Sequence, residues 1–263
     1  MEINKSKFSC KRDELIIRGL EYKPEGANLP IFIVCHGFTS NYKIMMDYAR
    51  LAANMGFAAY CFDFCGGSLL VGTSDGKNTD MSVLTEIRDL NVVIEYVKSL
   101  SYTDSSRIVL MGHSMGGLVC SMVASERNDI SKLILLAPAF MLPDDARKGN
   151  MLDAKFDPEN IPNTLVCGFM RIGKQYVEDM MNIDAYQHIQ NFSGDVLILY
   201  GNKDERVPYS CIRKAAKLYR RRIGSKTFLK IFDGLGHRYL AKEDKLTVMK
   251  PIVVFLKNFC KTV

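Results

Sequence analysis

The 263-residue sequence predicts an α/β fold with a mostly parallel sheet of eight strands and helices on its faces. Apolar segments of strand length alternate with amphipathic helical patterns, as is typical of parallel βαβ units. Apolar residues make up 48% of the chain and charged residues 24%, which is ordinary for a globular protein and excludes a disordered or fibrous one. No repeat or low-complexity linker divides the chain, so we expect residues 1–263 to form a single domain.

The predicted elements follow one another in a regular order. Residues 1–25 indicate an extended hairpin whose second arm is Glu14–Tyr22. The other six predicted strands are Pro30–Cys35, Phe57–Phe62, Arg107–Met111, Lys132–Leu136, Asp195–Tyr200 and Thr227–Phe232. Apolar residues at helical spacing predict helices over Tyr42–Met55, around Leu84–Val97, and over Ser114–Asn128, Ser210–Ile223 and Asp244–Phe259. Pro251 predicts a kink or a late start in the last of these helices.

The alternation stops after the sixth strand. Between residues 139 and 192, three prolines and scattered aromatic residues replace the regular pattern. An irregular insertion of this length inside a compact domain is usually functional, so we expect residues 139–192 to form a lid or cap.

Charge and cysteine usage narrow the class of protein. Residues 1–20 carry charges throughout and lack the apolar core of a secretory signal, and no segment approaches the roughly 18 apolar residues of a membrane span. We therefore expect a cytoplasmic protein, with no membrane association, whose eight cysteines are mostly reduced and buried. Cys61 and Cys65 have no partners at zinc spacing, so no metal is predicted. The net charge is +6, but the basic stretch Arg213–Lys230 accompanies no nucleic-acid-binding motif and is expected to be a solvated helix face.

The clearest chemical pattern is Gly112-His-Ser114-Met-Gly116, between the strand Arg107–Met111 and a predicted helix. This G-x-S-x-G arrangement is a nucleophile elbow, a sharp strand-to-helix turn that lifts the serine hydroxyl above the sheet. Small residues at 112 and 116 let the two backbones approach closely. The alternative is an ordinary glycine-rich turn, and the flanking strand and helix argue against it.

A serine nucleophile needs a base, and the base needs an acid to orient it. Of the four histidines, His237 is the best placed, because it follows the last strand and reaches the sheet edge where Ser114 lies. Asp204, in the loop after the strand Asp195–Tyr200, is the predicted acid, and Glu205 is the alternative. The alternatives to these catalytic roles are structural ones: Asp204 as a helix cap and His237 as a turn residue.

An acyl-transfer site also needs two donors for the oxyanion. The N–H group of Met115 directly follows the nucleophile. The second donor is expected in the loop after the strand Pro30–Cys35, at Phe38. The segment Gly67-x4-Gly72-Thr73 resembles a phosphate-binding loop but lacks its lysine, and no dinucleotide fingerprint follows the first parallel strand.

These motifs, in this order, resemble the cinnamoyl and feruloyl esterases of the α/β-hydrolase fold, within the serine aminopeptidase-like and monoacylglycerol-lipase-like hydrolases. The matching segments are His36–Thr39, Phe62–Phe64, Ser74–Gly76, Met81–Val83, Gly112–Gly117, Leu135–Ala139 and Gly201–Asp204. The resemblance implies the triad Ser114, Asp204 and His237 and oxyanion donors at Phe38 and Met115. It also places an aspartate that binds the phenolic hydroxyl of the substrate early in the lid, at Asp145 or, one residue away, Asp144.

The sequence departs from this family at two places: the loop Cys65–Thr73 is longer than usual, and Leu152 replaces a polar lid residue. The resemblance predicts a serine carboxylesterase that acts on a small-molecule ester with an aromatic acyl group and needs no cofactor. A homodimer is left open. The alternatives are a lipase or peptidase with the same triad and a non-catalytic ligand receptor on the same scaffold.

Overall fold

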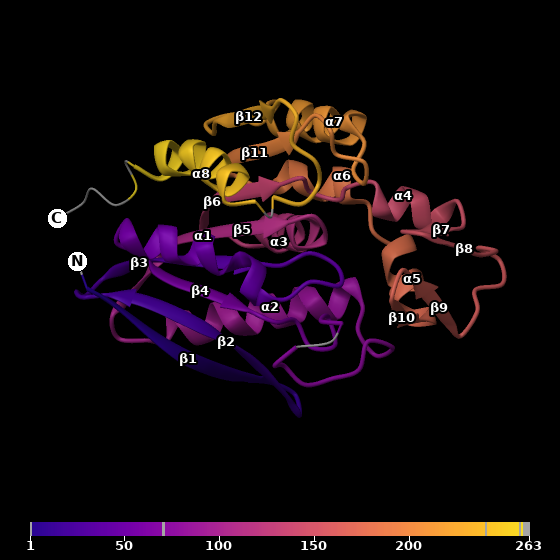
Figure 1. Ribbon diagram of the computed structural model, residues 1–263, viewed down its shortest axis with the longest axis horizontal. Coiled ribbons are helices and arrows are strands. Elements are labelled where there is room, and N and C mark those ends of the chain that lie inside the picture. The colour runs from indigo at the N-terminus through magenta and orange to yellow at the C-terminus, as the bar shows by residue number, and fades with distance from the viewer. Residues whose placement is uncertain (1, 70–71, 240, 258, 260–263) are drawn as a thin grey trace.

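The computed structural model describes residues 2–69, 72–239, 241–257 and 259. Its main element is an eight-stranded sheet in the order β1-β2-β4-β3-β5-β6-β11-β12 (Figure 1). The strands are β1 (Ile3–Arg12), β2 (Leu15–Pro24), β3 (Leu29–Cys35), β4 (Ala58–Phe62), β5 (Thr103–His113), β6 (Ile130–Leu136), β11 (Asp195–Gly201) and β12 (Thr227–Phe232). The β1–β2 hairpin and the β2–β4 pair are antiparallel, and all other neighbours are parallel. The predicted α/β class with a mostly parallel sheet is confirmed.

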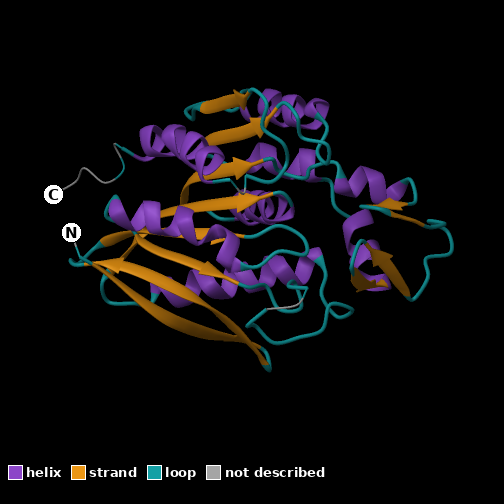
Figure 2. Ribbon diagram, viewed as in Figure 1, coloured by secondary structure: helices purple, strands orange, loops and turns teal. Residues whose placement is uncertain are grey.

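Helices cover both faces of the sheet (Figure 2). The helices α1 (Tyr42–Asn54) and α8 (Lys242–Leu256) pack on one face, and α2 (Val83–Lys98), α3 (Met115–Glu126) and α7 (Tyr209–Tyr219) pack on the other. Strand β3 is buried along its whole length and divides its side chains between the two cores, with Ile31 and Ile33 on the α2–α3 side and Phe32 and Val34 on the α1 side. A strand covered on both faces reads as a continuous apolar run, which is why β3 is predictable from sequence.

The last helix differs from expectation. Helix α8 begins at Lys242 and continues through Pro251, so the late start that the proline suggested is wrong. Proline removes one backbone hydrogen bond from a helix interior. The helix nevertheless buries Val248, Ile252 and Leu256 at four-residue spacing, and this packing stabilises it across the proline.

The segment between β6 and β11 is a series of short elements. They are α4 (Leu142–Arg147), β7 (Asn150–Met151), β8 (Ala154–Lys155), β9 (Thr164–Cys167), β10 (Met170–Gly173), α5 (Lys174–Met181), α6 (Ala185–His188) and the 3-10 helix η1 (Ile189–Asn191). In Figure 1, α4, α5 and both small hairpins lie beyond the arrowheads of the parallel strands, at the carboxyl edge of the sheet. Residues 139–192, which we call the insertion, thus place these elements at the edge where ligands bind in open α/β sheets, whereas α6 and η1 pack against α3.

No helix in the described part of the chain is long and apolar enough to cross a membrane. The basic residues of α7, including Arg213, Lys214 and Lys217, lie on its exposed face, as predicted. The helix ends at Tyr219, so the rest of the stretch Arg213–Lys230 is not a helix face: it forms a loop and the start of β12. The described cysteines are free thiols; Cys35, Cys61, Cys65, Cys120 and Cys167 are buried, Cys10 and Cys211 are partly exposed, and Cys260 lies outside the described residues.

Candidate active site

Ser114 sits in a strained turn at the carboxyl end of β5. Its backbone has φ 54° and ψ −116°, a region that residues with a side chain rarely adopt, and α3 begins at the next residue. A Cβ atom added to Gly112 would collide with the Gly116 carbonyl, and one added to Gly116 would collide with the carbonyl of His36. The two glycines are thus required by the close approach of β5, α3 and the loop after β3.

A chain of hydrogen bonds runs from Ser114 through His237 to Asp204. The Ser114 Oγ lies 3.0 Å from His237 Nε2, and His237 Nδ1 lies 2.8 Å from Asp204 Oδ2. His237 itself is 8% exposed, so this contact is shielded from bulk water. The structure therefore brings together the three residues predicted for the triad, although they follow β5, β11 and β12 and are distant from one another in the chain.

The second carboxylate oxygen of Asp204, Oδ1, explains why Asp204 and not Glu205 faces His237. Asp204 Oδ1 accepts hydrogen bonds from the backbone amides of Arg206 and Val207, each at 2.8 Å. Burial acts to raise the pKa of Asp204, but the hydrogen bonds from His237, Val207 and Arg206 outweigh it and hold that pKa below its ordinary value. Glu205 is exposed and lines the neighbouring cavity without a hydrogen bond to His237.

Phe38 and Met115 lie at the same cavity as Ser114. Among the described residues, neither backbone amide has a hydrogen-bond acceptor, so both are free to bind an oxygen atom. Gly37 brings the Phe38 loop close to the nucleophile, since a Cβ atom on Gly37 would lie 3.1 Å from Ser114 Cβ.

His36 fixes this loop. Its Nδ1 lies 2.9 Å from the Gly37 carbonyl, and the Phe64 amide donates to its Nε2 at 3.2 Å. A ring that donates at Nδ1 and accepts at Nε2 is neutral, in accord with the pKa of His36, which burial lowers despite the nearby carboxylate of Asp63. His36 is thus a structural histidine.

His113 has a contact that sequence analysis missed. Its Nε2 lies 3.0 Å from the backbone carbonyl of His237, and the centroids of the two rings are 4.9 Å apart. Burial lowers the pKa of His113 to about 4, with further contributions from His237 and Arg238. The histidine at the end of α6, His188, is partly exposed, and its ring bonds only the carbonyl of Asp184, the residue that caps this helix.

The lowered pKa of His113 predicts a loss of stability in acid. Between pH 6.5 and about 4 the unfolded chain binds a proton at this residue that the folded protein does not, so the free energy of unfolding falls as the pH falls. Because His113 is partly exposed, we discount this effect and expect the free energy of unfolding to be about 1 kcal/mol lower at pH 5 than at pH 7. This difference corresponds to a Tm lower by about 2–4 °C. Thermal unfolding at pH 7 and pH 5 should therefore show a smaller loss of Tm in His113→Gln than in the unmodified protein. Equal losses would contradict the neutral His113, because all other groups are common to both proteins.

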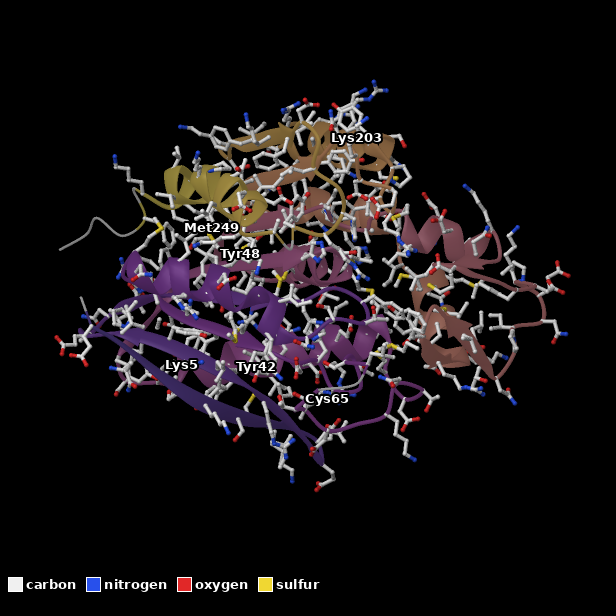
Figure 3. The ribbon with its side chains drawn as sticks, viewed as in Figure 1. Lys5, Tyr42, Tyr48, Cys65, Lys203 and Met249 are labelled. Atoms are coloured by element: carbon white, nitrogen blue, oxygen red, sulfur yellow. The ribbon has the colours of Figure 1, made fainter. Side chains whose placement is uncertain are left out.

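A cavity of about 420 Å³ opens beside Ser114, between the sheet edge and the insertion. Its apolar lining comes from both sides, with Met141, Leu142, Leu152 and Phe169 from the insertion and, on α1, Tyr48, which Figure 3 labels. Leu152, the residue that departs from the family pattern, has a positive φ of 56° in the turn between β7 and β8.

Asp145 is the carboxylate that α4 places at this cavity. Burial raises its pKa, and among the described residues no group donates a hydrogen bond to its carboxylate. Asp144 does not line the cavity, and its side chain pairs with Arg147 at 2.6 Å. Of the two aspartates considered from the sequence, only Asp145 faces the space next to Ser114.

The loop Cys65–Thr73 has a structural anchor. The amide and the hydroxyl of Thr73 both donate to Asp63 Oδ2, at 2.8 and 3.0 Å. The carboxylate of Asp63, bonded to this loop, opposes phosphate binding, in agreement with the missing lysine.

Within the described residues, no group of three or more histidine, cysteine, aspartate or glutamate side chains could hold a metal ion.

Comparison with known proteins fits this geometry. The sequence profile of the prolyl oligopeptidase family matches residues 49–262. The chain belongs to the prolyl oligopeptidase family. The protein named "Putative esterase/lipase 2" of Mycoplasma pneumoniae is 26% identical over 231 residues, which are 78% of this chain and 81% of that protein. Together with the esterase structure described next, it identifies the chain as an esterase/lipase-like hydrolase, and the predicted resemblance to ester-cleaving α/β-hydrolases is confirmed.

Three relatives show the range of activities on this fold. The structure of Est1E from Butyrivibrio proteoclasticus with ferulic acid bound has a TM-score of 0.87 and 28% identity, covering 97% of this chain and 100% of that one. The monoglyceride lipase of Mus musculus is 28% identical over 149 residues, which are 54% of this chain and 46% of the lipase. The acylamino-acid-releasing enzyme of Mus musculus is 22% identical over 215 residues, which are 74% of this chain and 27% of that enzyme.

Proposed function

We propose that this family member hydrolyses carboxylic esters by two acyl-transfer steps at Ser114. The hydrogen-bonded chain from Ser114 through His237 to Asp204, beside a cavity of substrate size, carries this proposal. His237 takes the proton of Ser114 as its oxygen attacks the ester carbonyl, and then gives that proton to the leaving alcohol. Water then attacks the acyl-enzyme with His237 again as base, which releases the acid and restores the serine.

Asp204 and the two free amides stabilise the charges that form during these steps. The carboxylate orients the His237 ring and stabilises its cation, and its lowered pKa keeps it ionised at neutral pH. The amides of Phe38 and Met115 are the proposed donors to the oxyanion of each tetrahedral intermediate. Removing one such donor commonly costs about 10²–10³-fold in kcat.

We further propose that the acyl group is a hydroxycinnamate and that residues 139–192 cover it as a lid on one α/β-hydrolase domain, residues 1–263. Support comes from the ferulic acid in the Est1E structure, the apolar side chains that the insertion brings to the cavity, and the position of Asp145. A partly buried carboxylate that lacks a hydrogen-bond donor is unfavourable. The phenolic hydroxyl of a bound substrate would donate the missing hydrogen bond.

Asp145→Ala should therefore be selective among substrates. Hydrogen bonds to charged groups contribute about 1.5–3 kcal/mol, so we expect kcat/KM for methyl ferulate to fall by roughly 10- to 100-fold. The value for methyl cinnamate, which lacks the hydroxyl, should change by less than about threefold. Asp144→Ala is the matched control, since that aspartate faces away from the cavity and pairs with Arg147. An equal loss on both esters would remove the hydroxycinnamate assignment and leave the serine chemistry standing.

A substrate panel distinguishes this proposal from the other activities of the fold. The similarity to monoglyceride lipase favours a lipase as the second candidate. Methyl ferulate, methyl caffeate, p-nitrophenyl butyrate, a monoacylglycerol and an aminopeptidase substrate should be compared by kcat/KM. The proposal predicts the highest values for the two hydroxycinnamates. Preference for the monoacylglycerol or the peptide substrate would contradict it, and stoichiometric capture without turnover would indicate a receptor.

A further inference from the structure

His113 links the nucleophile to the base through the backbone. It precedes Ser114 in the chain, and its side chain reaches the His237 carbonyl, 3.0 Å from Nε2. A carbonyl oxygen only accepts hydrogen bonds, so the proton of the His113 ring is on Nε2. This contact thus joins the residue directly before Ser114 to the backbone of His237.

The surroundings of His113 keep its ring neutral. The groups that face it are the rings of His237 and Tyr239, the carboxylate of Asp204 and the guanidinium of Arg238. Burial, with smaller contributions from His237 and Arg238, outweighs the hydrogen bond to the His237 carbonyl and the attraction of Asp204, and the pKa of His113 falls to about 4. A neutral ring donates its hydrogen bond without repelling the imidazolium that forms on His237 during reaction.

The same ring also touches the loop that carries Phe38. A Cβ atom on Gly37 would lie 3.2 Å from His113 Nδ1, so the ring occupies the space between Gly37 and the His237 loop. On its other side, the His237 loop is joined to the Asp204 loop, where the Lys203 amide donates to the Leu235 carbonyl at 2.9 Å. Lys203, which Figure 3 labels, lies in the loop that follows β11. His113 therefore joins the backbone of the base loop to the elbow, in addition to the bond between His237 Nε2 and Ser114 Oγ, and Lys203 joins the base loop to the acid loop.

We infer that His113 is a positioning residue for the general base: its Nε2–H group holds the His237 backbone at a fixed distance from Ser114. This inference rests on the proposed function, because it assigns His237 the role of base. Small displacements of a catalytic group cost large factors in rate, of order 10²-fold for about 1 Å. Loss of the His113 donor should thus lower kcat with little change in KM.

The test compares three substitutions at this position on p-nitrophenyl butyrate, with Tm measured for each protein. His113→Phe keeps a flat ring and removes the donor, and kcat should fall by about 10- to 100-fold with KM within about threefold. His113→Gln can donate from its side-chain amide and should recover to within about fivefold of the unmodified protein. His113→Leu, smaller than phenylalanine, gives the same comparison if the phenylalanine variant does not fold. His188→Phe is the matched control, because His188 is a partly exposed histidine that also bonds a backbone carbonyl but does not line the cavity beside Ser114, and its kcat should not change.

A double-mutant cycle separates positioning from a general structural role. If His113 acts through His237, His113→Phe should cause no further loss in a His237→Ala protein. A further loss of the same factor there, or an unchanged kcat in His113→Phe and His113→Leu, would overturn the inference. Failure of the proposed function would look different, since His237→Ala would then keep its activity.

Discussion

Ser114→Ala is expected to lower kcat/KM by about 10⁴-fold or more on every ester that the protein cleaves. Alanine removes the attacking oxygen, and only binding and the oxyanion donors are left to accelerate the reaction. The measurement is steady-state kinetics on methyl ferulate and p-nitrophenyl butyrate. Activity above a few per cent of the unmodified protein would show that Ser114 is not the nucleophile.

The fold should survive this substitution. The cost of the φ 54° turn is present with either residue, and the Ser114 hydroxyl makes its hydrogen bond with His237 and not with the helix that follows. We expect the Tm to change little and ligand binding to persist. These two measurements, made on the same Ser114→Ala protein, separate a lost nucleophile from a lost structure.

Asp204→Asn should cause the second largest loss, of order 10⁴-fold in kcat. The reason lies in the two amides of Arg206 and Val207, which donate to Asp204 Oδ1. An asparagine keeps its oxygen toward these donors and presents its NH2 group to His237 Nδ1. The ring must then accept at Nδ1 and carry its proton on Nε2, where it cannot take the proton of Ser114.

Glu205→Gln is the matched control for this prediction. It makes the same chemical change one residue away, on an exposed side chain that has no bond to His237. We expect its kcat to stay within a few fold of the unmodified protein. A severe effect of Glu205→Gln with a mild effect of Asp204→Asn would reverse the assignment of the acid.

Much of the fold was predictable because the inner strands of the sheet are buried on both faces. The β3 segment is accordingly a continuous apolar run. The edge strand β12 is largely exposed, and its predicted ends nevertheless match those of the structure. The elbow was predictable for a local reason, since only glycine fits at 112 and 116. In contrast, the insertion uses strands of two to four residues, which are too short for a periodic pattern.

The details of the site depend on contacts that no spacing reveals. Asp204 and Glu205 are adjacent carboxylates, and only the position of the 206 and 207 amides decides which one turns toward His237. His113 had no visible role in the sequence, because its partner is a backbone carbonyl 124 residues away. Asp145 could be separated from Asp144 only when α4 placed one of them at the cavity and the other beside Arg147.

The most direct measurement is mass spectrometry of the protein after reaction with a fluorophosphonate, which phosphonylates an activated serine. We predict a single adduct on the intact protein, located by peptide mapping to Ser114. It should be absent from Ser114→Ala and form at least about 10²-fold more slowly in His237→Ala, since the serine then lacks its base. An adduct on another residue, or full ester turnover by a protein that forms no adduct, would contradict the assignment of Ser114 as the nucleophile.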